Sequence, residues 1–489
     1  MSATSPSTSA SPQPSALASV SPLGEPMEMS VLVYNVEYGG DKSTDAVIES
    51  IDADVVGLLE SYNRLPEIAA HTGYPYFNIG LQLMSKYPIL EPSGADGRYA
   101  FIEVEPGYVV AFFNTHLDYV RYGPALLARG SSIQEVTATE EEVRLSSLKL
   151  LTPYLEDVIA AGYPVFLTGD LNTPSSLDYT AITVGTRDGV SEPILWPVSE
   201  ELAGLGMRDT YREIHPDPLA KPGITWGNPD LKRRGVGDRI DYVYAGGATT
   251  TLSSALVGKN GDPDVDIGFT RWTSDHRAVL STFEVTPVAL PTSISLSSAM
   301  LTDGDSVQVR YHAPGNDMTT VAIVPSGADP GSAVKTLRGG ASGAFVVETI
   351  GWDPIGYEAV LLGADGDELA RAAFWVRSAT ASPILVSAKP AYAEGEPIEI
   401  SWVDGPANRW DWIGVYKGSA PDPGNDDYLL WSYVGGHDAG AIPPSVAGSM
   451  TLGPDSEGKA WPLPVGKYRI HYLLTDEFTS VAYVDITVE

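Results

Sequence analysis

The sequence predicts a layered α/β domain followed by two all-β sandwich modules. Short apolar segments alternate with amphipathic ones between residues 29 and 285, and helical periodicity disappears after the segment TPVALPTS. A weak internal repeat divides the remainder into two parts. At 489 residues the chain is also too long for a single hydrophobic core.

The first domain, predicted over residues 27–288, contains six apolar segments that we interpret as strands because they are rich in Val, Phe and Tyr and end in polar residues. They read MSVLVYNV, VVGLLE, YVVAFFNTHL, PVFLTGDLN, RIDYVYA and HRAVLSTFEV. One amphipathic helix interrupts them. Thr139 and Glu142 form a capping-box pattern, and apolar side chains follow at helical spacing as far as Val158. We therefore expect a helix that begins near Thr139.

Residues 292–378 and 382–489 are predicted to form the two sandwiches, because short strands alternate there with Gly, Pro and Asp turns. The segment PIGYEAVLLGADGDELARAAFWV of the first module parallels PVGKYRIHYLLTDEFTSVAYVDITV of the second, and TTVAIV parallels DWIGVY. Residues 1–26 consist mostly of Ser, Ala, Thr and Pro, which predicts a disordered tether.

Charge is the strongest bias of the composition: 63 Asp and Glu residues face 30 Lys and Arg residues, a net charge of −33. A field of this sign repels polyanions and favours solubility in a salty or extracellular medium. No apolar run approaches the roughly 20 residues of a membrane span. The chain contains no cysteine, which excludes disulfides and thiolate sites. We interpret Met1 as a start that replaces a removed export signal, and we expect a secreted or surface-attached protein.

Polar side chains stand at the ends of several predicted strands. Asp170 and Asn172 alternate at one strand exit and so face the same side; alone, this pair is typical of a turn. The other strand ends carry Asn35 and Glu37, Glu60, His116, Asp238 and Asp241, and Asp275 and His276. Strand ends at one edge of a layered α/β domain converge, so we expect these side chains to line one cleft.

The converging oxygen atoms predict a site for Mg²⁺, or for Mn²⁺ or Ca²⁺ in its place, because hard cations take carboxylate and amide ligands. The ligands expected from the pattern are Asn35, Glu60, Asp170, Asn172 and Asp275. His116 and His276 remain to handle protons and phosphoryl charge. A Ser-His-Asp hydrolase has little support, because no Gly-x-Ser-x-Gly elbow, Gly-rich phosphate loop or His-Glu-x-x-His motif is present.

Six motifs in order resemble the signatures of the endonuclease/exonuclease/phosphatase (DNase I-like) superfamily over about residues 29–286. They are YNVEYGG, LLES, FFNTHLD, LTGDLNTP, GITWGNP with GDRIDYVY, and TSDHRAVL. The resemblance implies a four-layer sandwich of two packed β-sheets flanked by helices, and divalent-metal hydrolysis of a phosphate ester. One departure is Leu59, where the family usually has Gln before the metal-binding Glu, so a supporting hydrogen bond is expected to be missing.

The resemblance also implies roles on the metal side of the site. Glu60 matches the principal metal ligand, with Asn35, Glu37 and Asp275 as the further ligands.

On the phosphate side, the resemblance implies that Asp170 orients or deprotonates the attacking water and that Asn172 holds phosphate or metal. His116 would stabilise the transition state. His276, paired with Asp241, is the other candidate base or phosphate contact, and the two candidate bases stay unranked. Asp241 is preferred to Asp238 because the RIDYV form fits the family best.

Substrate binding is predicted from two loops. The segment 118–137 offers Tyr119, Arg121 and Tyr122 beside the cleft, and the basic run Lys232, Arg233 and Arg234 would either hold additional phosphates or form a solvated loop. In the last module, NRWDWIGVYKG resembles a SKICH-like β-sandwich segment. The nearby tryptophans either form a polymer-binding platform or pack in the hydrophobic core of the module; they are Trp402, Trp410, Trp412 and Trp431.

The sequence therefore predicts a secreted, metal-dependent phosphoesterase that acts on a small molecule, a lipid headgroup of the inositol phosphate or sphingomyelin type, or a surface glycan. The first alternative is an extracellular nuclease, which the net charge disfavours. The second is a non-catalytic binding or adhesion protein on the same fold. Contact with a surface or polymer is expected through the C-terminal modules.

Overall fold

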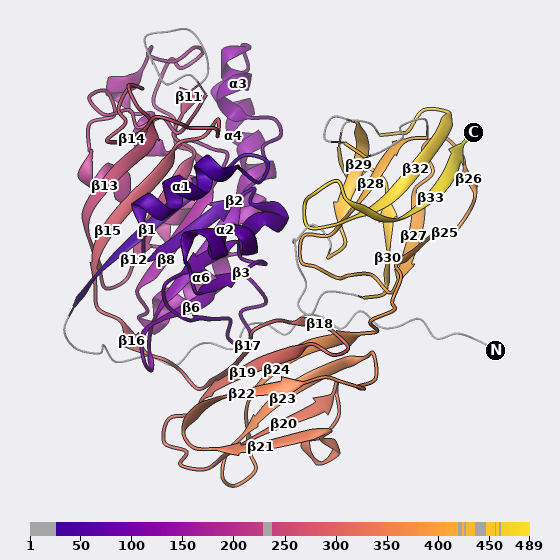
Figure 1. Ribbon diagram of the computed structural model, residues 1–489. Helices are drawn as coiled ribbons and strands as arrows, with labels where there is room; N and C mark the ends of the chain where they lie inside the picture. The colour runs from indigo at the N-terminus through magenta and orange to yellow at the C-terminus, as the bar shows by residue number, and fades with distance from the viewer. Residues whose placement is uncertain are drawn as a thin grey trace.

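The structure, a computed structural model, describes residues 26–227, 237–418, 423–424, 427–435, 446–454, 456–458 and 461–489. An α/β domain is followed by two β-sandwiches, which confirms the predicted fold class (Figure 1). The predicted tether lies outside the described residues except for Pro26, and the predicted domain boundaries stay predictions.

Two sheets form the centre of the α/β domain. The first has the order β14-β13-β15-β1-β2-β4-β3. Its strands are β1 (Met27–Asn35), β2 (Val55–Leu59), β3 (Tyr76–Asn78), β4 (Leu83–Ser85), β13 (Thr249–Lys259), β14 (Ile267–Phe269) and β15 (Ala278–Val285). The second has the order β5-β6-β7-β8-β12-β9, with β16 paired to β7. Its strands are β5 (Ile89–Leu90), β6 (Ala100–Glu105), β7 (Tyr108–His116), β8 (Val165–Asp170), β9 (Arg208–Asp209), β12 (Asp241–Gly246) and β16 (Val288–Ala289). A short pair, β10 (Trp226–Gly227) and β11 (Gly237–Asp238), lies apart from both.

Alternating side chains explain why the two sheets pack face to face. In β1, Val31 and Val33 point into the core that also holds Phe112 and Phe166 of the second sheet. The residues between them, Leu32 among them, instead pack with α1 and α2 on the outer face. A third core covers the outer face of the second sheet with α6. The layers are therefore helix, sheet, sheet and helix.

The outer layers are built from short helices. They are α1 (Lys42–Ile51), α2 (Leu65–Thr72), α3 (Gly123–Ala128), α4 (Ile133–Glu140), α5 (Ser146–Leu148), α6 (Thr152–Ala161), α7 (Pro197–Gly204) and α8 (Thr210–Ile214), with a π-helical turn at Glu141–Leu145. Single 3₁₀ turns lie at Tyr62–Arg64, Ser176–Asp178, Ala181–Thr183 and Pro330–Ser332.

The predicted helix start at Thr139 is wrong. The helix begins at Ile133, where Ser132 caps it and forms the capping box with Glu135. Thr139 instead lies inside the helix and donates its hydroxyl to Glu135 O. Three Ser/Thr-x-x-Glu patterns, beginning at Ser132, Thr137 and Thr139, follow one another in this stretch, and the local pattern alone does not say which one caps the helix.

The two sandwiches share one strand order. In the first, β17 (Ser293–Leu296), β19 (Ser306–His312) and β22 (Ser342–Glu348) face β18, β24, β23, β20 and β21. The bounds of the latter are β18 (Met300–Thr302), β20 (Thr319–Pro325), β21 (Lys335–Gly339), β23 (Gly356–Leu362) and β24 (Glu368–Arg377).

In the second sandwich, β25, β27 and β30 face β26, β33, β32, β28, β29 and β31. The bounds are β25 (Ile384–Ser387), β26 (Ala391–Tyr392), β27 (Ile398–Val403), β28 (Trp412–Lys417), β29 (Tyr428–Tyr433), β30 (Gly448–Leu452), β31 (Glu457–Gly458), β32 (Gly466–Leu473) and β33 (Ser480–Val488). The hairpin β23–β24 thus corresponds to β32–β33, in agreement with the sequence repeat.

Two of the four tryptophans proposed as a platform are core residues. Trp402 and Trp412 are buried, so they are not available to a polymer. Trp410 donates its indole N–H to Gly80 O of the α/β domain at 3.0 Å, and Trp431 packs edge-on against Trp412. The SKICH-like resemblance of this segment stays a prediction. Within the described part of the chain, no helix is long and apolar enough to span a bilayer.

Candidate active site

The first sheet brings Asn35 and Glu60 together. Strands β1 and β2 run parallel with Asn35 opposite Leu59, so the next residue, Glu60, leaves the sheet beside Asn35. Asn35 Nδ2 donates to Glu60 Oε1 at 3.0 Å, and Tyr38 N donates to Glu60 Oε2 at 3.2 Å. Leu59 itself is buried in the core between the sheets. These donors fix the Glu60 carboxylate at the end of its strand.

The second sheet places three chemical groups in one row. Strand β7 pairs with β8 so that His116 lies opposite Asp170, and β12 pairs with β8 so that Asp241 lies opposite the same residue. The central carboxylate is therefore flanked by an imidazole on one side and a second carboxylate on the other. Asp170 and Asp241 are both buried.

The two sheet edges meet at Asp170. Asn35 Nδ2 of the first sheet donates to Asp170 Oδ2 of the second at 3.1 Å. The sheets approach so closely beneath this contact that a Cβ at Gly57 would lie 2.1 Å from Thr168 Oγ1. Glycine is thus required there, and the close approach joins the metal and phosphate sides of the predicted site.

Asp170 and Asn172 form a tight turn as well as a site. The backbone N–H of Asn172 donates to Asp170 Oδ1 at 2.9 Å, and Asn172 Nδ2 donates to Leu117 O and lies 3.1 Å from His116 Nε2. Asn172 adopts a positive φ of 49°, which Asn tolerates better than most residues. The turn therefore aims its amide at His116.

His276 is held by Asp241. Its Nδ1 donates to Asp241 Oδ2 at 2.9 Å, which leaves Nε2 3.7 Å from Asp170 Oδ2 and 3.7 Å from Asp275 Oδ1. Burial opposes a charge on this imidazole, but the carboxylates of Asp241 and Asp170 outweigh it and raise the pKa of His276 to about 10. His276 is therefore an imidazolium at neutral pH in the metal-free protein.

The outer part of the site is acidic. Glu37 Oε2 accepts a hydrogen bond from Asp275 N at 2.9 Å, and Trp226 Nε1 donates to Asp275 Oδ2 at 3.0 Å. Burial raises the pKa of Glu37, and the negative charges of Asp275 and Glu60 raise it further. Carboxylates that repel one another in this way fit a divalent cation, which would compensate their charge.

One group of ligand atoms converges at the site. Within the described residues, Asp170, Asp241 and His276 have ligand atoms within 4.8 Å of one another, although His276 and Asp241 are already bonded to each other. The predicted ligands Glu60, Glu37 and Asp275 lie on the outer side of the same site, close enough for their charges to interact, but do not form a group as tight as this one. Asn35 donates its Nδ2 to Glu60 and accepts from Glu37 N with its Oδ1, so it orients these residues, and the second lone pair of its Oδ1 is left for a cation.

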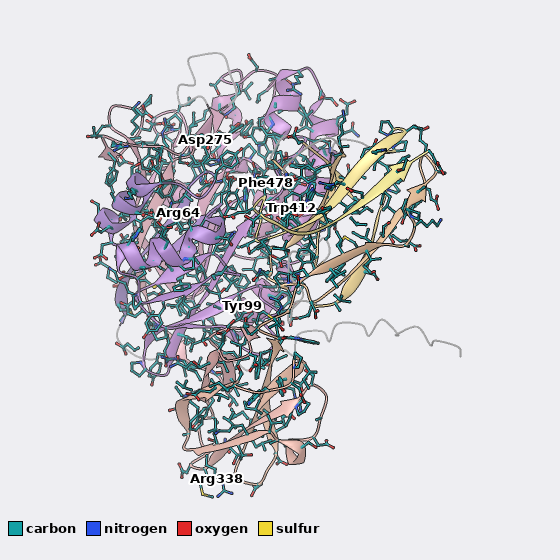
Figure 2. All side chains as sticks on the ribbon, turned by 45° about the vertical axis from the view of Figure 1, so that its right-hand side comes forward. Arg64, Tyr99, Asp275, Arg338, Trp412 and Phe478 are labelled. Atoms are coloured by element: carbon teal, nitrogen blue, oxygen red, sulfur yellow. The ribbon has the colours of Figure 1, made fainter. Side chains whose placement is uncertain are left out.

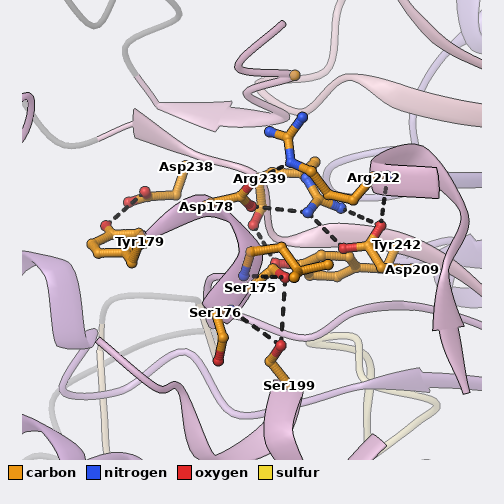
Figure 3. Close-up of polar contacts among 12 residues, drawn as sticks. Ser175, Ser176, Asp178, Tyr179, Ser199, Asp209, Arg212, Asp238, Arg239 and Tyr242 are labelled. Carbon is orange, nitrogen blue, oxygen red and sulfur yellow. Dashed lines mark hydrogen bonds and ion pairs between the residues drawn. The ribbon is translucent and has the colours of Figure 1, made fainter. Parts of the chain in front are cut away.

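Asp238 belongs to a different network, which separates it from Asp241. Its carboxylate accepts hydrogen bonds from Tyr122 and Arg187. It also accepts one from Tyr179, which Figure 3 shows. The next residue, Arg239, is buried and pairs with Asp178 and Asp209. This ion-pair network anchors the chain two residues before Asp241 and so positions the partner of His276.

The structure does not gather all the predicted substrate-binding residues. Tyr122 donates its hydroxyl to Asp238 at 3.0 Å, and Arg121 pairs with Glu142 at 3.0 Å. Tyr119 is exposed, with its hydroxyl 3.0 Å from that of Tyr428 in the last sandwich. The basic run Lys232, Arg233 and Arg234 lies outside the described residues.

Three supporting residues were not predicted from the sequence. Ser274 donates its hydroxyl to Asn35 O, and Trp226 packs its ring near that of His276 besides holding Asp275. Gln82 accepts from both the amide and the hydroxyl of Ser61 and so holds the segment after Glu60. Each of the three supports a residue far away in the sequence. Ser274 and Trp226 lie in the motifs TSDH and GITWGNP, which marked their segments, whereas Gln82 lies in no motif.

Comparison with known proteins identifies the family of this domain. The model of the Endonuclease/Exonuclease/phosphatase family matches residues 32–276. The uncharacterized protein F14F9.5 of Caenorhabditis elegans is 30% identical over 244 residues, which cover 43% of this chain and 74% of that protein.

Two solved structures show weaker similarity. The endonuclease/exonuclease/phosphatase from Beutenbergia cavernae is 17% identical with a TM-score of 0.34, over 71% of this chain and 99% of that chain. D. rerio TDP2 complexed with single strand DNA product is 16% identical with a TM-score of 0.33, over 53% and 99%. The family model and the nematode relative carry the assignment: the chain belongs to the Endonuclease/Exonuclease/phosphatase family.

Proposed function

We propose that the protein is a secreted, Mg²⁺-dependent phosphoesterase that hydrolyses a phosphate ester of a small molecule, a lipid headgroup or a surface glycan. The observation that carries this proposal is the hydrogen-bonded chain from Glu60 through Asn35 to Asp170, with Nε2 of His116 3.5 Å and Nε2 of His276 3.7 Å from Asp170 Oδ2. Hydrolysis of a phosphate needs an oriented water and positive charge at the phosphoryl oxygens, and these groups supply both.

Each protein group has a separate task in this proposal. Glu60, Glu37 and Asp275 would hold the cation, which would neutralise charge on the phosphate when bound. Asp170 accepts hydrogen bonds from Asn35 Nδ2 and Asn172 N, so its carboxylate is fixed in the position from which it would orient the attacking water.

The two imidazoles then act on the phosphate rather than on the water. His276 has its Nδ1 bonded to Asp241, and as an imidazolium it donates from Nε2 to a phosphoryl oxygen. His116, beside Asn172, stabilises the same group. This division favours Asp170 over His276 as the general base.

Charge supports a small ester over a polynucleotide. The chain carries a net charge of −33, and the outer part of the site holds Glu37 and Asp275. Such a rim repels the neighbouring phosphates of a nucleic acid and tolerates a single phosphate at the cation. Secretion is part of the proposal and rests on the same acidic composition; detection of the protein in culture medium rather than in washed cells tests it.

The experiment is a substrate panel with metal control. The full chain, stripped with EDTA and resupplied with Mg²⁺, is assayed on inositol phosphates, glycerol phosphates, sphingomyelin, bis-p-nitrophenyl phosphate and plasmid DNA. We expect turnover of at least one small ester, loss of it in EDTA and recovery with Mg²⁺. Turnover that persists in EDTA contradicts the metal mechanism, faster cleavage of DNA supports the nuclease, and no turnover at all supports the non-catalytic scaffold.

A further inference from the structure

The last sandwich touches the segments that carry the active site. The amide of Asn63, three residues after Glu60, donates to Glu477 Oε1 at 3.2 Å. Trp410 donates to Gly80 O at 3.0 Å, just before Gln82, which fixes Ser61. These contacts link residues more than 300 positions apart in the chain. The sandwich is therefore fixed against the site rather than tethered at a distance.

A third contact lies on the phosphate side. The hydroxyl of Tyr119, three residues after His116, lies 3.0 Å from that of Tyr428. The sandwich thus reaches the chain beyond both Glu60 and His116. A surface that touches both sides of the site forms part of its wall.

The wall carries a carboxylate, Asp476, in the hairpin loop between β32 and β33. Its Oδ1 accepts from the Tyr433 hydroxyl at 2.7 Å, and its amide donates to Trp410 O at 2.8 Å. No hydrogen bond to its Oδ2 is present among the residues that the structure describes. Burial raises the pKa of Asp476 to about 6 against the opposing hydrogen bond from Tyr433, and His116 lowers this pKa whereas Glu60 raises it. Asp476 therefore lies within electrostatic range of both sides of the site.

The loop is held in a costly conformation. Thr475 and Asp476 adopt positive φ values of 47° and 62°, which disfavour residues other than glycine. The amide of Thr475 donates to the buried carboxylate of Asp411 at 3.1 Å, which keeps the loop in place. The carboxylate of Asp476 is thus positioned by its domain before any substrate arrives.

We propose that Asp476, fixed by Tyr433, is a specificity-determining residue that accepts a hydrogen bond from a hydroxyl or ammonium group on the organic part of the substrate. The inference rests on the proposed phosphoesterase function. A carboxylate repels phosphoryl oxygens, so the group that meets Asp476 is the one attached to the phosphate. Hydroxyl and ammonium groups share the donor chemistry that the carboxylate recognises.

The test compares esters with and without a donor on the organic group. Donor-bearing substrates are glycerol phosphate, with hydroxyls, and phosphoethanolamine, with an ammonium; donor-free ones are phenyl phosphate and bis-p-nitrophenyl phosphate. For Asp476→Asn we expect kcat/KM to fall by about 10-fold or more on the preferred donor-bearing ester, the range of a charged hydrogen bond, and by less than about 3-fold on the donor-free esters. Whichever of glycerol phosphate and phosphoethanolamine has the higher kcat/KM with the wild-type protein shows whether Asp476 prefers a hydroxyl or an ammonium group.

Two further variants complete the test. Asp365→Asn changes the exposed carboxylate in the corresponding loop of the first sandwich and should alter neither rate. Tyr433→Phe removes the hydroxyl that fixes Asp476 and should give a smaller loss of the same selectivity. An equal fall on both classes of ester, or no fall in Asp476→Asn, overturns the proposal.

Binding separates this proposal from the function on which it rests. If wild-type protein with Mg²⁺ hydrolyses no ester, the phosphoesterase proposal fails, and calorimetric binding of glycerol phosphate, phosphoethanolamine and phenyl phosphate replaces the rates. Weaker binding of a donor-bearing ester alone in Asp476→Asn then still supports the subsite. Unchanged affinity for all three overturns it, and matching circular dichroism spectra control for folding.

Discussion

The two sandwiches are alike in topology and differ in what they touch. The first docks near the start of β7, where Arg310 lies 3.8 Å from Glu103, the residue that pairs with Val109 of β7. The last docks beside the end of the same strand, at Tyr119, three residues after His116, and at Asn63, three residues after Glu60. Nine residues of strand separate the two places, about 26 Å. Figure 2 shows Arg338 of the first sandwich at the opposite end of the molecule from Asp275.

The corresponding hairpin loops show the same difference. Residues 363–367 of the first sandwich turn through Gly366 and are largely exposed. Residues 474–479 of the last use non-glycine residues at positive φ and lie against the α/β domain. One repeat has thus kept a relaxed, solvent-facing turn, whereas the other holds a strained loop against the site. Strain of this kind persists where surrounding contacts enforce it.

The largest expected effect lies in the α/β domain itself and sets the scale for both sandwiches. Asp170→Asn and His276→Ala should each lower kcat by roughly 10²–10⁴-fold. The first removes the carboxylate that orients the attacking water, and the second removes the imidazolium that donates to the phosphoryl oxygen. Steady-state rates on the best ester of the panel measure this. A fall of less than 10-fold in both variants would mean that the site is elsewhere.

The pH dependence of stability should have opposite signs at the two ends of β7. The raised pKa of His276, about 10, means that its pair with Asp241 stabilises the fold fully below about pH 6.5 and that this stability is lost as pH rises through about 10. Burial lowers the pKa of His312 in the first sandwich, and the charge of Glu103 only partly opposes this. The neutral imidazole of His312 therefore fits the folded state, and the stability of the fold that depends on it is present above about pH 6.5 and is lost as pH falls below that value.

Thermal unfolding in EDTA from about pH 5 to about pH 10.5 measures both effects. His276→Gln should flatten the alkaline limb, where the wild-type loss is on the order of 3–5 kcal/mol, and His312→Gln should flatten only the acid limb. An alkaline limb unchanged by His276→Gln would show that His276 is not held as an imidazolium.

Docking of the last sandwich should be the stronger of the two. Trp410→Ala removes an interdomain hydrogen bond and a ring packed on Tyr433, for about 2 kcal/mol. Arg310→Ala removes a partly exposed ion pair worth less than about 1 kcal/mol. Hydrogen exchange at the Asn63 amide, which Glu477 protects, should speed up in the first variant only. Equal protection in both would make the two interfaces equivalent.

The strand-end pattern predicted the site because its geometry is local to each strand. Asn35 and Asp170 end buried strands and Glu60 follows one, and parallel pairing brings such ends together. The preference for Asp241 over Asp238 rested on the RIDYV motif alone, and the structure adds the physical difference: Asp241 bonds to His276, whereas Asp238 bonds to Tyr179.

The last sandwich's share in the site could not be predicted in the same way. The contact between Asn63 and Glu477 joins two domains, and no periodicity or motif encodes it. From the sequence alone, Asp476 is typical of a turn residue, as is Asp365 in the parallel repeat, because both lie in polar segments between predicted strands. The difference between them arises from which end of each sandwich faces the α/β domain.

The smallest effects should separate stability from activity in the two hairpin loops. Gly366→Ala places a side chain at φ 84°, with nothing within 4 Å of the new Cβ, and should cost about 1 kcal/mol of folding stability without changing kcat/KM.

Thr475→Gly relieves backbone strain of similar size but adds chain entropy to the unfolded state and loses buried contacts. The stability of this variant should therefore stay within about 0.5 kcal/mol of the wild type. Because glycine no longer restricts the loop, Asp476 should lose its fixed position, and KM for the donor-bearing ester should rise a few-fold. Unfolding midpoints and kinetics on both classes of ester measure the pair. A rise in KM for Gly366→Ala as well would show that the two loops do not differ in function, whereas a rise confined to Thr475→Gly would mean that the strained backbone serves the site and not the fold.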